Sequence, residues 1–181
     1  IKTGARAVMK QRLKNETRRT FLKKTALTAT TISIPAFFHS LVRGQTAASN
    51  RITIGCIGVG RMGLLDLQDI IRHDDVQVVA VCDVDSNRAL YARDYVDNYY
   101  RKQTKDLAYA DCRTYRDFRE LLERRDIDAV LICTPDHWHA LPAIEAAKAG
   151  KDIFLQKPLT YSLQEGRLLS NTVRQYGNVF Q

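Results

Sequence analysis

The stretch RITIGCIGVGRMG, residues 51–63, decides the fold of this chain. Residues 51–57 are rich in β-branched and apolar side chains, and glycines follow directly at positions 58, 60 and 63. Beyond them, apolar residues at positions 64, 65, 67, 70 and 71 recur with the spacing of one helical face. The stretch therefore predicts a strand, a tight glycine turn and a helix in immediate succession.

Each glycine of this turn is expected to have its own physical role. Gly58 permits the tight turn, Gly60 lets a phosphate group approach the backbone, and Gly63 allows the helix to pack closely on the strand. The first helical residues, Arg61 and Met62, would present free N–H groups and the positive end of the helix dipole to a pyrophosphate. A glycine turn without any ligand is the alternative interpretation.

A second strand is predicted over residues 76–82, where the sequence VQVVAVC is nearly all apolar, as in a parallel strand that is covered on both faces. It ends at Asp83, which lies 20 residues beyond Gly63. An acid at this point would accept hydrogen bonds from the ribose hydroxyls of an adenosine and would repel a 2′-phosphate. The strand-helix-strand unit therefore favours NAD as the cofactor over NADP, unless Asp83 is simply a solvated turn residue.

The rest of the chain continues this alternation of strands and helices. Asp85 can cap the next helix, the sequence SLQE at residues 162–165 forms a capping box, and glycines at 150 and 177 are typical of helix ends. The fold class predicted is α/β, a doubly wound parallel Rossmann sheet in the order 3-2-1-4-5-6 that is cut off in its sixth strand. The further elements expected are helices over 85–100, 117–125, 138–149 and 162–176, and strands over 112–115, 129–133, 152–155 and from 178 onward.

Two later segments should face the same ligand, because the crevice of such a sheet lies at the carboxyl ends of its strands. One is TPDHWH, residues 134–139, in which we expect Asp136 to cap a helix. Its two histidines have no third ligand at a recognised spacing, so no metal site is predicted. The other is QKPL, residues 156–159, where Lys157 could donate a proton or a hydrogen bond to a substrate oxygen, or could be an ordinary surface lysine.

The positive charge of the chain is concentrated at its start. Residues 1–48 contain ten Lys and Arg and the single acidic residue Glu16, which leaves 18 basic and 19 acidic residues for the remainder. A nearly neutral remainder argues against a nucleic-acid partner. The pair Arg18-Arg19, a mildly apolar stretch over 25–38 and small residues near Ala48 together resemble a twin-arginine export signal.

We therefore expect a leader over 1–48 and a dinucleotide-binding domain over 49–181, exported in its folded state by the twin-arginine machinery to the periplasm or to another place outside the cytoplasm. An amphipathic helix or a disordered basic arm is the alternative for the leader. No run of 18 apolar residues is present, so a stable membrane anchor is not expected. The four cysteines, Cys56, Cys82, Cys112 and Cys133, form no CxxC pair and are interpreted as small core residues, although a disulfide between strands would be possible outside the cytoplasm.

Taken together, the motifs GVGRMG, CDVD, TPDHWHALPAIEAAKAGKD and QKPL resemble the glucose-fructose oxidoreductase and inositol dehydrogenase family, Gfo/Idh/MocA. The resemblance covers residues 51–181. It implies that Thr134, Pro135 and His139 lie near the nicotinamide, and that Lys157 acts on the substrate beside a cis proline. Gln156, counted here with the cofactor-binding residues, replaces the usual glutamate of the family and removes a negative charge beside the lysine.

The resemblance further implies an NAD-dependent oxidoreductase that transfers a hydride between nicotinamide and a sugar or polyol hydroxyl. In the family, a second domain supplies the substrate pocket and most of the homo-oligomer interface, and we expect the present chain to lack that domain and to be inactive alone. The alternatives are an NAD-dependent glycosidase of the same family and a sugar or dinucleotide sensor without turnover.

Overall fold

The computed structural model describes residues 51–181, so the predicted leader and its twin-arginine pair lie outside the described residues. Strands and helices alternate along this part of the chain, as the sequence predicted. The strands are β1 (Ile52–Ile57), β2 (Val76–Cys82), β3 (Arg113–Tyr115), β4 (Ala129–Ile132) and β5 (Asp152–Leu155). The helices are α3 (Arg61–Ile70), α4 (Ser86–Thr104), α5 (Phe118–Leu122), α6 (Ala140–Lys148) and α7 (Leu163–Tyr176), with a 3-10 turn, η2 (Asp136–Trp138), before α6.

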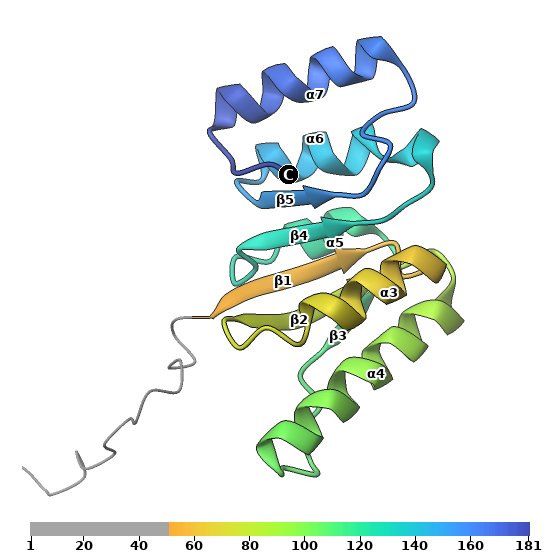
Figure 1. Cartoon of the computed structure of the whole chain (residues 1–181), viewed down its shortest axis with the longest axis vertical. Helices are drawn as coiled ribbons and strands as arrows, with labels where there is room; N and C mark the ends of the chain where they lie inside the picture. The colour runs from red at the N-terminus through yellow and green to blue at the C-terminus, as the bar shows by residue number, and fades with distance from the viewer. Residues whose placement is uncertain (1–50) are drawn as a thin grey trace, which may run out of the picture. The chain divides into compact units, whose positions relative to one another are not determined.

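The five strands form one parallel sheet in the order β3-β2-β1-β4-β5 (Figure 1). Beyond β5, the backbone of Val179 and Gln181 hydrogen-bonds with that of Ile153, and Phe180 pairs with Ile153 in parallel. This is the place of the sixth strand in the predicted order. The predicted Rossmann topology is therefore confirmed.

Helices cover both faces of the sheet (Figure 1). On one face, α3 and α4 pack on β1 and β2 through Leu67, Ile71 and Val96, which are almost fully buried. On the other face, α5 and α6 pack around Leu121 and Ile132, and α7 adds Leu169 to this second cluster. Because the central strands are covered on both sides, most of their residues are apolar, which explains the nearly continuous apolar runs in the sequence.

Most predicted helix ends are confirmed. The Asp85 carboxylate accepts hydrogen bonds from the backbone N–H groups of Asn87 and Arg88 at the start of α4. Ser162 and Glu165 form the expected capping box of α7, which ends before Gly177 in the left-handed conformation. The predicted cap at Asp136 is wrong, because Asp136 is itself the first residue of η2, whose N-cap is Pro135. His139, the N-cap of α6, forms no cap either, since its ring contacts the carbonyls of Thr134 and Pro158 instead.

Two helix lengths differ from the prediction. The second crossover helix continues to Thr104 rather than Tyr100, since the Tyr100 side chain packs inward and the helix ends only at Lys105, which adopts a left-handed conformation. The helix α5 is shorter than expected and stops at Leu122. Shortly after this helix, the side chain of Arg124 points toward the sheet, and its guanidinium donates a hydrogen bond to the Val79 carbonyl at 3.0 Å.

An extra residue in β2 interrupts its pairing with β1. Ile54 pairs with Val78, but the next residue, Gly55, pairs with Ala80, so that Val79 has no partner on β1. Side chains complete the hydrogen bonding here. The Val78 N–H donates to the Tyr100 hydroxyl at 2.9 Å, and the Val79 carbonyl accepts from Arg124. This β-bulge is thus connected to α4 on one face and to the α5–β4 loop on the other.

Candidate functional site

The glycine turn between β1 and α3 is as tight as its sequence predicts. Gly58 has a φ of +82°, and a Cβ at this position would lie 2.8 Å from the backbone of Cys133 and Thr134. A Cβ on Gly63 would lie 1.9 Å from the Gly58 carbonyl oxygen, so α3 contacts the turn directly. Gly60, in contrast, faces open space, and its nearest neighbour would be the Arg88 guanidinium at 3.4 Å. The start of α3 is therefore accessible to a ligand.

Asp83 lies at the carboxyl end of β2 and is 8% exposed. Its two carboxylate oxygens accept hydrogen bonds from the backbone N–H groups of Val59, at 3.0 Å, and Asp85, at 2.9 Å. These bonds fix the carboxylate beside the glycine turn. Because each oxygen has a further lone pair, the carboxylate can still accept bonds from the hydroxyls of a ribose.

The segment after β4 brings Thr134, Pro135 and His139 to the same crevice. His139 is buried, and its ring nitrogens contact the carbonyl oxygens of Thr134, at 2.7 Å, and Pro158. His139 thus connects the segments that follow β4 and β5. The hydroxyl oxygen of Thr134 is buried and has no hydrogen-bond partner within the described residues.

The segment after β5 contains Gln156 and Lys157. The Lys157–Pro158 peptide bond is cis, as the resemblance implied. The Gln156 side chain accepts a hydrogen bond from the Lys157 backbone N–H at 2.9 Å and donates one to the Asp66 carboxylate of α3 at 2.7 Å. The Lys157 side chain is exposed and borders the crevice.

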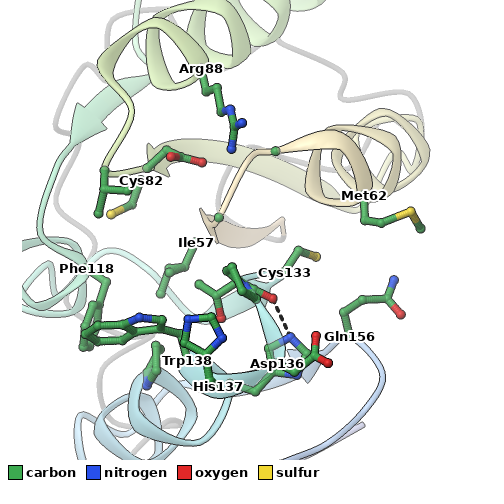
Figure 2. Close-up of a pocket in the computed structure, with 18 of the residues that line it drawn as sticks. Ile57, Met62, Cys82, Arg88, Phe118, Cys133, Asp136, His137, Trp138 and Gln156 are labelled. Carbon is green, nitrogen blue, oxygen red and sulfur yellow. Dashed lines mark hydrogen bonds between the residues drawn. The ribbon is translucent and has the colours of Figure 1, made fainter. Parts of the chain in front are cut away.

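These segments enclose one cavity of about 690 Å³, which is within the range of small-molecule and cofactor sites (Figure 2). Of the residues singled out in the sequence, all except Gly63 line it directly, and Gly63 lies under it. The lining residues predicted from the sequence are Gly58, Gly60, Arg61, Met62, Asp83, Thr134, Pro135, His139, Gln156 and Lys157.

Sequence reasoning missed four lining residues, Arg88, Arg116, Phe118 and Arg119, whereas Trp138 belongs to the segment 134–139 that was expected at the crevice. Figure 2 shows Arg88 extending from α4 toward the β1–α3 turn, while Phe118 and Trp138 border the opposite part of the cavity. Arg116 and Arg119 also line the cavity and add positive charge to it. All four missed residues follow the carboxyl end of a strand, so the rule that located the other two segments could have found them as well.

The features of the cavity fit a dinucleotide. The open start of α3 and the nearby arginines suit a pyrophosphate, the Asp83 carboxylate suits a ribose, and the unpaired Thr134 hydroxyl can bond a polar group of the ligand. Within residues 51–181, no group of three His, Cys, Asp or Glu side chains is placed to hold a metal ion.

Comparison with known proteins identifies the family. Residues 52–181 match the Gfo/Idh/MocA oxidoreductases, described as an oxidoreductase family with an NAD-binding Rossmann fold. The chain belongs to the Gfo/Idh/MocA oxidoreductase family. Its parallel sheet and glycine turn are therefore those of an NAD-binding domain.

Two relatives of the chain have names that state different activities, an oxidoreductase and a glycosyl hydrolase. The chain is 34% identical over 133 residues to the uncharacterized oxidoreductase YrbE of Bacillus subtilis (strain 168), covering 74% of this chain and 35% of YrbE. It is also 34% identical over 119 residues to a glycosyl hydrolase family 109 protein of Stenotrophomonas maltophilia (strain K279a), covering 66% of this chain and 26% of that protein. The chain thus spans about a third or less of the length of these relatives.

A solved structure supports the fold. Scyllo-inositol dehydrogenase from Lactobacillus casei, with bound NAD(H) and scyllo-inositol, aligns with a TM-score of 0.61 and 24% identity over 72% of this chain and 35% of that enzyme. Within the described residues, no helix is long and apolar enough to cross a membrane.

Proposed function

We propose that the whole protein transfers a hydride between the carbon of a sugar or polyol hydroxyl and NAD, with Lys157 as the proton-handling group. The observation that carries this proposal is that Asp83 and Lys157 line one cavity together with the glycine turn. In such a cavity, a dinucleotide held at Asp83 and Gly60 would extend toward Lys157. Family membership and the inositol dehydrogenase likeness support the substrate class.

Each part of the cavity would have a separate task in this reaction. The start of α3 and Arg88 would bind the pyrophosphate, and Asp83 would orient the adenosine ribose. Bound NAD supplies the hydride acceptor. The Thr134 hydroxyl would position the nicotinamide end, and the Lys157 amine would take the hydroxyl proton of the substrate, or return it in the reverse direction. The substrate itself would be held by a further domain of the whole protein, as in the family.

Replacement of Lys157 tests this role. In the full-length protein, we expect Lys157→Ala to lower turnover of a sugar or polyol by about 100-fold or more, because acid-base help is lost, while NAD affinity changes little. Lys102→Ala, on the exposed surface of α4, is the matched control. Steady-state rates and NAD titrations measure both effects. Wild-type turnover of the Lys157 variant would exclude the catalytic role, and sugar oxidation by residues 49–181 alone would exclude the need for a further domain.

A glycosidase that uses bound NAD for transient oxidation is the second candidate. It is favoured by the likeness to the glycosyl hydrolase family 109 protein of Stenotrophomonas maltophilia, which is as identical to this chain as YrbE is. The two functions differ in their products. A dehydrogenase releases NADH in proportion to substrate, whereas the glycosidase cleaves glycosides without net redox change. Tight NAD binding without either product would instead indicate a sensor.

We also propose that the protein is exported in its folded state to the periplasm, with residues 1–48 as a twin-arginine leader, and that the full-length protein forms a homo-oligomer. The Arg18-Arg19 pair and the basic charge of the leader support export. Replacing both arginines with lysine should retain the protein in the cytoplasm, measured by cell fractionation, while Lys23→Arg should leave export unchanged. Unchanged export of the Arg18→Lys, Arg19→Lys variant would contradict the leader assignment.

A further inference from the structure

Three segments of the cavity wall converge on one side chain outside it, that of Asp66. One oxygen of its carboxylate accepts a hydrogen bond from the Gln156 amide at 2.7 Å and another from the Cys133 thiol at 3.2 Å. Asp66 belongs to α3, Cys133 follows β4, and Gln156 follows β5. A single carboxylate thus connects the helix of the glycine turn with the ends of the next two strands.

The packing of α3 explains how Asp66 reaches this position. A Cβ on Gly63 would lie 3.0 Å from the Cβ of Cys133, so the helix contacts β4 at this glycine. Residues three apart lie on the same face of a helix, and Asp66 is three residues after Gly63. The close approach at Gly63 therefore brings the Asp66 carboxylate to the end of β4. Figure 2 shows Gln156 extending toward the side of the cavity where Met62 of α3 lies.

The partners of Gln156 determine which way its amide points. The amide nitrogen donates to Asp66, so the amide oxygen faces the other way and accepts from the backbone N–H of Lys157 at 2.9 Å. Two hydrogen bonds through the Gln156 amide thus connect the Asp66 carboxylate to the backbone of Lys157. In addition, Asp66 is half-buried and supplies a carboxylate next to the segment in which Gln156 replaces the usual glutamate.

We propose that Asp66 is a positioning residue that, through Gln156, fixes the backbone of Lys157 and so places the lysine amine at the end of the cavity. The inference rests on the proposed function for its catalytic meaning, but not for its geometry. A charged hydrogen bond holds the amide more firmly than a neutral one, which favours a carboxylate at position 66. A glutamate at position 156 could accept the bond from the Lys157 N–H but, when ionised, could not donate one to Asp66. Gln156 makes both bonds and so connects the backbone of Lys157 to α3.

The first test measures the hydrogen bond directly in the present chain, without catalysis. We expect Asp66→Leu to accelerate the hydrogen exchange of the Lys157 backbone amide by about tenfold or more, measured by NMR, because the Gln156 amide is no longer held. Asp69→Leu, on the exposed side of the same helix, is the matched control and should leave this rate unchanged. The exchange of amides in β1 shows whether each variant remains folded. Unchanged exchange at Lys157 in folded Asp66→Leu overturns the proposal.

The second test exchanges donor and acceptor. In the variant Asp66→Asn, Gln156→Glu, the amide lies on α3 and the carboxylate beside Lys157, so both hydrogen bonds can form again. We expect this double variant to restore slow exchange at Lys157. In the full-length protein, Asp66→Leu should lower kcat by about tenfold or more with a change in NAD affinity below about threefold, and the double variant should recover most of kcat. A double variant as impaired as Asp66→Leu in both measurements overturns the positioning role.

These outcomes separate the inference from the proposed function. If Lys157→Ala retains full turnover, the proposed function fails, but the exchange rate at Lys157 still decides whether Asp66 holds this segment. If Lys157→Ala is inactive and Asp66→Leu is fully active, the proposed function stands and the positioning role of Asp66 fails.

Discussion

At the scale of single residues, Gly60 and Gly63 belong to one glycine motif, at the N-cap and in the first turn of α3, but we expect them to be required for different reasons. A Cβ on Gly63 would lie 1.9 Å from a backbone oxygen, whereas a Cβ on Gly60 would meet only the flexible Arg88 side chain at 3.4 Å. We therefore expect Gly63→Ala to lower the free energy of unfolding by about 2–4 kcal/mol and to weaken NAD binding as well, because α3 has to move away from the turn.

The control for this prediction is the neighbouring glycine itself. Gly60→Ala should stay within about 0.5 kcal/mol of the wild type in stability, since its φ of −69° suits alanine, but should weaken NAD binding by about tenfold or more, because the methyl group occupies the path of the pyrophosphate. Urea denaturation and NAD titration of both variants measure the two effects. Equal stability losses in the two variants would contradict this division of roles.

At the scale of secondary-structure elements, the bulge in β2 depends on two side chains from opposite layers. The Val78 N–H is buried and donates to the Tyr100 hydroxyl at 2.9 Å. Tyr100→Phe removes this acceptor, and we expect it to lower the free energy of unfolding by about 1–3 kcal/mol. Tyr91→Phe, on the exposed side of the same helix, should change it by less than about 0.5 kcal/mol. Urea denaturation compares the two, and equal stability of both variants would show that the bond contributes nothing.

At the scale of the whole domain, buried thiols and a buried phenol make the fold sensitive to alkali. Burial raises the pKa of Cys82 and of Cys112 from 9.0 to about 12, and that of Tyr100 from 10.0 to about 12. Because the folded state keeps these groups neutral while the unfolded chain ionises, their contribution to stability is complete below pH 9 and is lost as the pH rises toward 12. Each group contributes a slope of up to about 1.4 kcal/mol per pH unit in this window.

The measurement is urea denaturation at pH 8, 9.5 and 11 with constant ionic strength. We expect the free energy of unfolding to fall steadily across this series, and Cys82→Ala to make the fall less steep, since one titrating thiol is removed. A free energy of unfolding that stays constant from pH 8 to pH 11 would contradict this prediction.

Local patterns were sufficient to predict most of this domain, and the exceptions have a common origin. The bounds of β2 and the capping box of α7 follow from neighbouring residues, so the sequence predicted them correctly. The missing cap before α6 and the short α5 are accompanied by contacts of His139 with the Pro158 carbonyl and of Arg124 with the Val79 carbonyl, both distant in sequence. The position of Asp66 beside Gln156, 90 residues away, likewise depends on how α3 packs against β4 and β5, which no single motif contains.

The bulge in β2 also affects the direction in which the carboxylate of Asp83 points. Before the bulge, Val76 and Val78 face the layer of α3 and α4, but after it Ala80 and Cys82 face the layer of α5 and α6. Val79 thus reverses the alternation of side chains along the strand, which is consistent with Asp83 facing Val59 and the glycine turn. Deleting one residue from the middle of β2 would keep an apolar strand. It would, however, direct the side chain of Asp83, which follows the strand, toward the layer of α5 and α6. Whether the number of residues in this strand is odd or even therefore decides whether the carboxylate at position 83 can accept the bond from Val59 beside the glycine turn.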